Sequence, residues 1–386
     1  MTSILQLIRP QRTSSIFTKR QKSTPSTPPA SLDCHIDTLP IVIQHDGDND
    51  DTTISGSLLL EVTEDVVELH SLQAMLVVHV AYKKPFKKGC KNCKHQYTEL
   101  KKCNLIDTTT DLQRGFHKYP LSYRVPSYVP PSMDTSIASV TYDFQATASV
   151  RRVGQLSTPD VINLNRLLPV TRSIPIPDTQ TCSKRIYQAA GVEINCTYDT
   201  VMNPASKNEA TLTLSGLRSS PGNGEEVHFW RVCSGTWILE EIVKASAPAC
   251  PAHSTQDKGE GCREQNKRLI LGDSTFYKGW ITDDDAGTMS MDFCFSIRKS
   301  LNHYTQDTGN LTDASVSHAL VLELQMMKEV HLVGRPDLAT RKGVGRILRS
   351  EHRVVLSNHA RLSDQVVEEL LPPYDGLRGA PPVYEE

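Results

Sequence analysis

The sequence predicts an all-β protein with two tandem immunoglobulin-like antiparallel β-sandwiches and with disordered N- and C-terminal tails. Two observations carry this prediction. From about residue 35, apolar runs of roughly five to eight residues recur between turn-like clusters rich in Gly, Pro and Asn. Long amphipathic helical patterns are few. Many short strands separated by turn residues are typical of β-sandwiches, and the runs are numerous enough for two.

The expected strands follow one another along the chain. The clearest spans residues 140–150, where apolar and polar residues alternate for much of the length, as in a half-buried strand. The runs are residues 38–44, 56–61, 74–82, 136–150, 210–217, 227–232, 236–243, 288–297, 319–326 and 353–356. A short helix is expected at residues 364–371.

These patterns divide the chain into four predicted parts. They are a basic arm (1–34), a first sandwich (35–172), a second sandwich (173–362) and a tail (363–386), with the proline-bounded segment 169–177 as the join. Up to residue 32 the arm carries cations and no acidic residue, and its Ser, Thr and Pro content is typical of a disordered segment. A mitochondrial transit peptide shares this bias, although prolines interrupt any long amphipathic helix.

Composition narrows the class of protein. Of the 386 residues, 38% are hydrophobic and 22% charged, as in soluble globular proteins. No run approaches the roughly 20 apolar residues of a spanning helix, and no apolar signal core follows the N-terminus. We therefore expect a cytoplasmic protein whose ten cysteines are reduced. Walker A, G-x-S-x-G and H-E-x-x-H motifs are all missing, so no enzyme is predicted.

The last sixteen residues hold two proline–tyrosine elements. A proline run favours the extended polyproline II conformation, which docks in the aromatic groove of a WW domain at low entropic cost. The L-P-x-Y variant supplies Leu371, Pro372 and Tyr374, and the P-P-x-Y element supplies Pro381, Pro382 and Tyr384. We expect each element to fill one WW groove; the alternative is a terminus without a partner.

Four residues have the spacing of a metal site. Cys90 and Cys93 form a CxxC pair, and Cys250-Pro-Ala-His253 repeats the spacing with a histidine last. Together they would complete a tetrahedral zinc set that ties the first sandwich to the second, if the two loops meet. Cys103 and Cys262 are substitute ligands, and four unrelated loop residues remain the alternative.

Cations gather in two stretches of the sequence. One surrounds the CxxC pair and includes Lys83, Lys84, Lys87 and Lys88, and the other includes Arg341, Lys342 and Arg346. Charged runs are usually solvated faces, but such clusters also suit acidic or phosphorylated protein segments and anionic lipid. We predict a cargo- or lipid-binding basic patch from these residues.

Several local patterns occur in the order typical of the arrestin family. Residues 115–126 (GFHKYPLSYRVP), 128–132 (YVPPS) and 140–146 (VTYDFQA) resemble the first arrestin sandwich. Residues 237–241, 276–280, 291–297 and 317–322 resemble the second. Over about residues 36–360 and the tail, the chain resembles the fungal α-arrestins, or arrestin-related trafficking adaptors, of the subfamily with a CxxC loop in the first domain. The resemblance implies the arrestin fold for the two predicted sandwiches.

The resemblance also implies a function that the residues alone do not. It implies a non-enzymatic adaptor that links plasma-membrane, endosomal or Golgi transporters, through their acidic cytosolic segments, to a WW-domain ubiquitin ligase of the HECT class. Transfer of ubiquitin to the cargo then promotes endocytosis, and the adaptor is recruited peripherally to membranes. Two alternatives stay open: an arrestin-fold cargo-sorting scaffold without a ligase, and a zinc-knuckle nucleic-acid-binding protein. Only Phe86 and Tyr97 lie among the basic residues, which disfavours nucleic acid.

Overall fold

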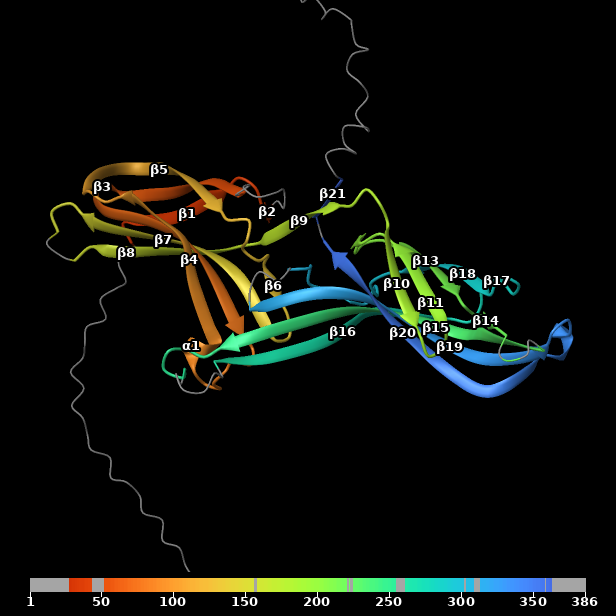
Figure 1. The fold of residues 1–386 in the computed structure, drawn as a ribbon. Helices are drawn as coiled ribbons and strands as arrows, with labels where there is room; N and C mark the ends of the chain where they lie inside the picture. Colours follow the sequence, from red (N-terminus) through yellow and green to blue (C-terminus); the bar gives the residue numbers. More distant parts are fainter. Residues whose placement is uncertain are drawn as a thin grey trace, which may run out of the picture.

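The computed structural model consists almost entirely of strands, arranged as two β-sandwiches side by side (Figure 1). It describes residues 28–43, 52–155, 158–220, 222, 225–254, 261–301, 303–308, 313–357 and 359–362. The predicted all-β, arrestin-like double sandwich is confirmed. The N-terminal arm up to residue 27, the expected helix at 364–371 and the whole predicted tail lie outside the described residues.

The first sandwich is one antiparallel sheet folded over on itself. Its strands are β1 (Ala30–Ile36), β3 (Thr52–Tyr82), β4 (His95–Ile106), β5 (Thr110–Val125), β6 (Met133–Asp134), β7 (Ala138–Arg152) and β8 (Asp160–Leu168). The first part of β3 pairs with β1 and β5, and its later part pairs with β4 and β7. Register shifts, including one between Val62 and Val66, bend β3 from one layer into the other.

The second sandwich packs two sheets face to face. The five-stranded sheet has the order β10 (Thr181–Tyr187), β11 (Val192–Tyr198), β13 (Asn208–Ser215), β18 (Thr288–Phe295), β17 (Ile281–Asp283). The other contains β12 (Val201–Met202), β20 (Thr340–Leu356), β19 (Ala314–Leu332), β15 (Glu226–Pro248) and β14 (Arg218–Ser219), with β16 (Cys262–Phe276) also on β15. Alternate residues of both sheets, such as Leu212 and Leu322, are fully buried between them.

The predicted join is itself a strand. β9 (Val170–Ile176) pairs in parallel with β2 (Ile41–Ile43) and with β21 (His359–Leu362). It therefore links the start of the first sandwich to the end of the second. The predicted boundary between residues 172 and 173 falls inside β9, and the predicted domain limits stay predictions.

Several strands are longer than the sequence indicates. The runs 56–61 and 74–82 lie in the single 31-residue strand β3, and the runs 227–232 and 236–243 lie in the 23-residue strand β15. Ser234 and Gly235 resemble a turn in the sequence, but a register shift after Val232 keeps β15 continuous. A Cβ on Gly235 would lie 2.2 Å from the Phe276 ring, so this glycine serves a close approach and not a turn.

The two sandwiches share part of their core. Val243 and Ala245 at the end of β15, and Val316 near the start of β19, belong to the same buried cluster as the core of the first sandwich. Figure 1 shows the ends of β15, β16 and β19 extending beside β4 of the first sandwich. This contact brings the loop after β15 close to the CxxC loop of the first sandwich.

Candidate metal centre and docking surfaces

The four predicted metal ligands meet at this contact. Cys90 precedes the four-residue helix α1 (Lys91–Lys94), which carries the fully buried Cys93. The positive φ of 85° at Gly89 turns the chain into this knuckle, a conformation that favours glycine. Cys250 lies just after β15, and His253 lies in the turn that follows.

The ligand atoms are close enough to share one ion. Cys90 Sγ lies 3.8 Å from Cys250 Sγ. His253 Nδ1 lies 3.6 Å from Cys93 Sγ and 3.2 Å from Cys250 Sγ. All four ligand atoms lie within 4.8 Å of one another. The group can therefore hold a metal, as the spacing of the sequence predicts.

Backbone amides support the sulfur atoms. The amide of Cys250 donates to Cys93 Sγ at 3.5 Å, which adds a hydrogen bond between the two loops. The backbone amide of Cys93 stabilises the Cys90 thiolate and is the leading cause that lowers the pKa of Cys90. The amides of His253 and Ser254 both bond to the carbonyl of Cys250, and so fix the second turn.

The two substitute ligands do not join this group in the described residues. Cys103 is half-buried in β4, where it pairs with Ala74. Cys262 is exposed at the start of β16. Of the residues that the structure describes, the cluster contains Cys90, Cys93, Cys250 and His253.

The predicted basic residues lie on two separate surfaces. Lys83, Lys84, Lys87 and Lys88 surround the knuckle, and Lys83 pairs with Asp134 at 2.7 Å. Arg341, Lys342 and Arg346 lie at the far end of the second sandwich, because β20 pairs there with the end of β19. The intervening length of β15 corresponds to about 60 Å of strand. The structure does not bring the two groups together.

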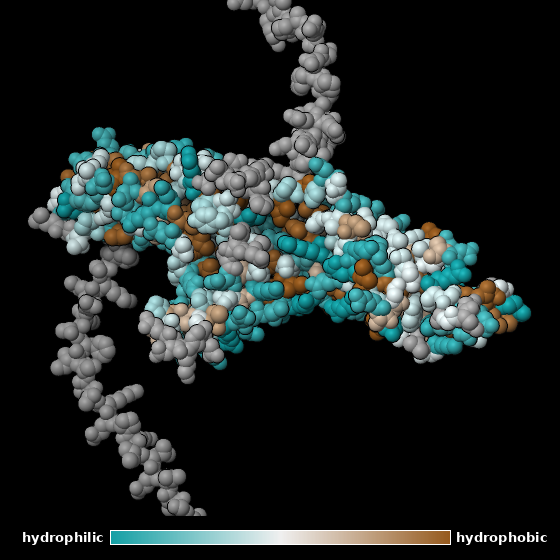
Figure 2. All heavy atoms as spheres, viewed as in Figure 1, coloured by the Kyte–Doolittle hydropathy of each residue, from teal (hydrophilic) through white to brown (hydrophobic). Residues whose placement is uncertain are grey.

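Most of the far group already has partners. Arg341 lies 3.3 Å from a Glu329 carboxylate oxygen, Lys342 lies 4.0 Å from Glu226, and Arg346 stacks over the Trp230 ring at 5.7 Å. Exposed apolar side chains adjoin them at the turn after β19, with Val333 58% exposed. Figure 2 shows hydrophobic residues at this tip of the second sandwich.

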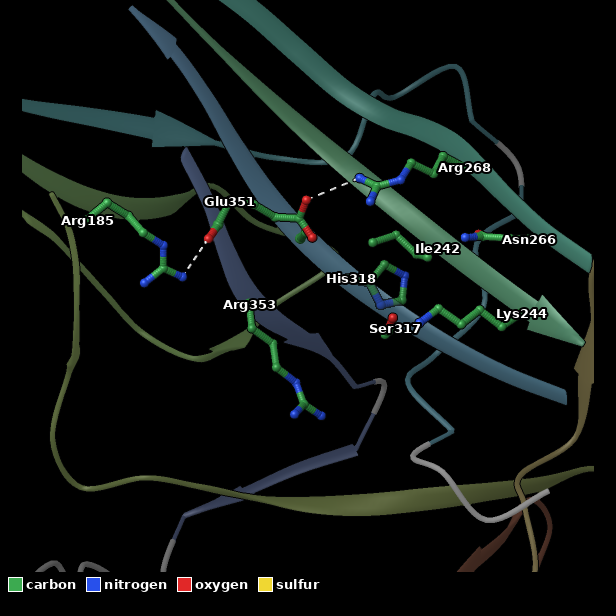
Figure 3. Close-up of a pocket in the computed structure, with 10 residues that line it drawn as sticks. Arg185, Ile242, Lys244, Asn266, Arg268, Ser317, His318, Glu351 and Arg353 are labelled. Carbon is green, nitrogen blue, oxygen red and sulfur yellow. Dashed lines mark hydrogen bonds and ion pairs between the residues drawn. The ribbon is translucent and has the colours of Figure 1, made fainter. Parts of the chain in front are cut away.

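A groove that sequence analysis missed lies on the second sandwich (Figure 3). It encloses about 540 Å³ and is lined by Arg185, Ile242, Lys244, Asn266, Arg268, Ser317, His318, Ala319, Glu351 and Arg353. In Figure 3, Lys244 and Arg268 project from β15 and β16, and Arg185 and Arg353 project from β10 and β20 on the opposite side. Its cations come from four strands that are far apart in the sequence, so the sequence does not show that they converge.

The groove carries excess positive charge. Arg268 pairs with Glu240 at 2.6 Å and with Glu351 at 3.3 Å. Among the residues that the structure describes, the Arg185 guanidinium bonds only to carbonyl oxygens, including that of Glu351 at 3.0 Å. Within the described part of the chain, the side chains of Lys244 and Arg353 make no hydrogen bond or ion pair. These three cations are available to an acidic ligand.

The remaining predicted site residues belong to the C-terminal tail. Leu371, Pro372, Tyr374, Pro381, Pro382 and Tyr384 lie outside the described residues. Within the described ranges, no helix has both the length and the apolar character needed to cross a membrane.

Comparison with known proteins agrees with the arrestin-like fold. A family model described as "LDB19: Arrestin_N terminal like" matches residues 72–257, which include all four clustered ligands. The uncharacterized proteins C1F12.05 and C18H10.20c of Schizosaccharomyces pombe are 22% and 24% identical over 373 and 369 residues. These matches cover 96% and 94% of this chain, and 93% and 98% of the relatives.

Protein LDB19 of Saccharomyces cerevisiae is 29% identical over an alignment of 212 residues that covers 48% of this chain and 25% of that protein. The similarity to LDB19 therefore covers about half of this chain and a quarter of that protein. Together with the double sandwich, the matches support an assignment of the chain to the α-arrestin family, with the arrestin-like model itself matching residues 72–257.

Proposed function

We propose that this α-arrestin links membrane transporters to a WW-domain ubiquitin ligase of the HECT class. The observation that carries the proposal is the pair of proline–tyrosine elements, Leu371–Tyr374 and Pro381–Tyr384, that follows the arrestin-like body. Such an adaptor binds cargo through its sandwiches and binds, through its tail, a ligase that supplies the catalytic activity. The ligase then transfers ubiquitin to the cargo, which promotes endocytosis from the plasma membrane or sorting at endosomes or Golgi.

Two elements on one tail favour binding to two WW modules. A single peptide–groove contact of this size is weak, and a second linked contact raises the avidity by about 10²–10⁴ where the geometry permits both. The six intervening residues, Asp375 to Ala380, separate the two tyrosine-containing elements. This arrangement suits a ligase with several WW domains in tandem.

The tail proposal is tested by binding of the full-length chain to tandem WW domains. We expect the wild-type chain to bind and the double variant Tyr374→Ala/Tyr384→Ala to lose binding. Tyr277→Ala is a matched control, because Tyr277 is 73% exposed on the second sandwich. Equal binding by the wild type and the double variant would contradict ligase recruitment and favour the cargo-sorting scaffold.

We further propose that the groove of Figure 3 is a docking surface for acidic cytosolic segments of cargo. The support is charge complementarity: Arg185, Lys244 and Arg353 face the groove without carboxylate partners. Asn266 and Ser317 add hydrogen-bonding groups beside them. The knuckle lysines and the Arg341–Arg346 group remain proposed contacts for acidic cargo or anionic lipid.

Charge-reversal variants distinguish peptide binding in the groove from general attraction by the surface charge. Lys244→Glu/Arg353→Glu is expected to weaken binding of an acidic peptide at least tenfold, because two attractive charges become repulsive. Lys207→Glu is the control, since Lys207 is an exposed cation between β12 and β13 and does not line the groove. Equal weakening by the control variant would show that the groove has no special role. Arg341→Glu/Lys342→Glu, assayed on anionic vesicles, tests the far group separately.

A further inference from the structure

We propose that Cys90, Cys93, Cys250 and His253 bind one structural Zn²⁺ ion that clamps the first sandwich to the second. The site belongs to both halves of the fold, because the CxxC knuckle follows β3 and the other two ligands follow β15. The inference is independent of the proposed ligase recruitment, which depends on the tail.

The distances between ligand atoms match a tetrahedral zinc ion. Bonds of about 2.3 Å to sulfur and 2.0–2.1 Å to nitrogen place two sulfurs about 3.8 Å apart, and a sulfur and a nitrogen about 3.5 Å apart. The observed sulfur–sulfur distance between Cys90 and Cys250 is 3.8 Å. The sulfur–nitrogen distances to His253 are 3.6 and 3.2 Å. The ligand atoms thus surround a space of the size of one ion.

The same distance shows that the pair is not joined by a disulfide in this structure. A disulfide bond requires sulfur atoms about 2.05 Å apart, whereas Cys90 and Cys250 are free thiols at 3.8 Å. Three sulfurs and one imidazole are soft or borderline ligands, so they select zinc over magnesium or calcium. Four protein ligands complete the coordination, as in a structural site, and leave no open position for catalysis.

The surrounding charge fits the occupied site. Three thiolates, one neutral imidazole and Zn²⁺ sum to a net charge of −1. The exposed lysines Lys87, Lys88, Lys91 and Lys94 flank the CxxC pair and offset this charge. Some of the lysines around the knuckle therefore have a role in the metal site itself, whether or not they also contact cargo.

The clamp would hold an interface that the protein already builds. Cys90 and Cys250 are 160 residues apart in sequence. Beside them, Gln265 Nε2 donates to the carbonyl of Lys84 at 2.8 Å, and Val243 packs into the core of the first sandwich. Metal binding to ligands from both halves adds its binding free energy to this contact. The ion thus fixes the angle between the two sandwiches.

Metal content of the purified full-length chain is the first test. After incubation with Zn²⁺ and removal of the unbound metal, we expect about one zinc per chain. Cys93→Ser and His253→Ala should each lose most of it. Cys103→Ser and Cys262→Ser are matched controls that should retain it, because neither residue lies in the cluster. Less than about a tenth of a zinc per wild-type chain would overturn the proposal, as would equal loss in the controls.

Cobalt replacement counts the sulfur ligands without relying on variants that fail to fold. Co²⁺ in the wild-type site should give tetrahedral visible bands and thiolate charge-transfer absorption from three sulfurs. Cys90→His keeps four ligands, so it should still bind one ion with charge-transfer absorption lower by about a third. An unchanged absorption, or octahedral cobalt bands in the wild type, would contradict the assigned ligand set.

Hydrogen exchange tests the clamp itself. A chelator should increase amide exchange in both loops, residues 84–95 and 249–254, by at least tenfold, while Cys262→Ser behaves as the wild type. Exchange that does not change, or that changes in only one loop, would show that the ion does not join the sandwiches. WW-domain binding through the tail should persist in Cys93→Ser, which keeps this test separate from that of the proposed function.

Discussion

His318 and Asp307 form a buried hydrogen bond of 2.6 Å between Nδ1 and Oδ2. The His318 side chain has no exposed surface, and its Nε2 lies 3.8 Å from Glu241 Oε2 on the neighbouring strand. The same Asp307 oxygen accepts the amide of Leu356 at 2.7 Å. The imidazole thus lies between two carboxylates behind the groove of Figure 3, in a position that sequence analysis did not single out.

The first prediction concerns the pH dependence of this cluster. Burial lowers the pKa of His318, but the hydrogen bonds and charges of Asp307 and Glu241 outweigh it, and the pKa is raised. Because its folded-state pKa is raised, the stabilisation that His318 contributes to the free energy of unfolding is fully present below its unfolded-state pKa of about 6.5. It is lost as the pH rises through the folded-state value.

Denaturant unfolding of the wild type and of Asp307→Asn, from pH 6 to pH 9, measures this contribution. Asp307→Asn should lower the free energy of unfolding by about 1–3 kcal/mol near pH 6, because it weakens a buried charge-assisted hydrogen bond. The difference should shrink as the pH rises. A difference that stays constant or grows toward pH 9 would contradict the assignment of a charged His318.

A second histidine should show the opposite dependence. Burial, with a smaller contribution from the Arg185 charge, lowers the pKa of His352 to about 4. His352 is fully buried, and its Nε2 lies 2.8 Å from Ser350 Oγ. Because the pKa is depressed, its contribution to stability is present above about pH 6.5 and is lost as the pH falls toward 4.

Acid unfolding between pH 7 and pH 4 tests this second prediction. His352→Gln keeps polar atoms at this position but does not titrate, so its free energy of unfolding should fall less steeply with acid than that of the wild type. His228→Gln is a control on the same sandwich, since His228 is only partly buried and pairs with Glu226. Parallel acid profiles for His352→Gln and the wild type would show that His352 does not titrate as stated.

The third prediction concerns a close backbone approach. A Cβ on Gly272 in β16 would lie 2.1 Å from the carbonyl oxygen of Ser296, which belongs to the backbone and cannot rotate away. Gly272→Ala should lower the free energy of unfolding by about 1–3 kcal/mol. Gly343→Ala is the matched control, because nothing lies within 4 Å of its added Cβ. Thermal unfolding of both variants is the measurement. Equal melting temperatures for Gly272→Ala and Gly343→Ala would contradict the predicted clash at Gly272.

The fourth prediction concerns an arginine with two carboxylate partners. Arg231 donates to Asp284 at 2.5 and 2.7 Å and to Glu329 at 2.9 Å, and this lowers the pKa of Asp284. Arg231→Gln should reduce stability by about 1 kcal/mol, an amount kept small because the group is partly solvated. Arg335→Gln removes one exposed pair with Asp337 and should change almost nothing. Chemical unfolding at low and at high salt measures both effects, and an equal loss in the two variants would refute the prediction.

Local patterns in the sequence determined the fold class and the residue types of the candidate metal centre. Alternation at 140–150 indicated the buried face of β7, because successive side chains of a strand point to opposite faces whatever the strand pairs with. CxxC and CxxH spacing places two ligands within one turn, so each half of the site is a local property of the chain. The two proline–tyrosine elements are also local sequence patterns. Their role as WW-domain ligands is a prediction that the binding experiment tests.

Tertiary structure alone decided which distant residues meet. Glycine is typical of a turn, yet Gly235 lies inside β15. A glycine is needed there because the Phe276 ring of the neighbouring strand occupies the space of a side chain. Arg185 and Arg353 share a groove only through the packing of β10 over β20. Cys93 and Cys250 approach each other because the end of β15 packs into the core of the first sandwich. Such contacts join residues that are far apart in the sequence. A local pattern of polarity or spacing cannot show which distant strands pack together.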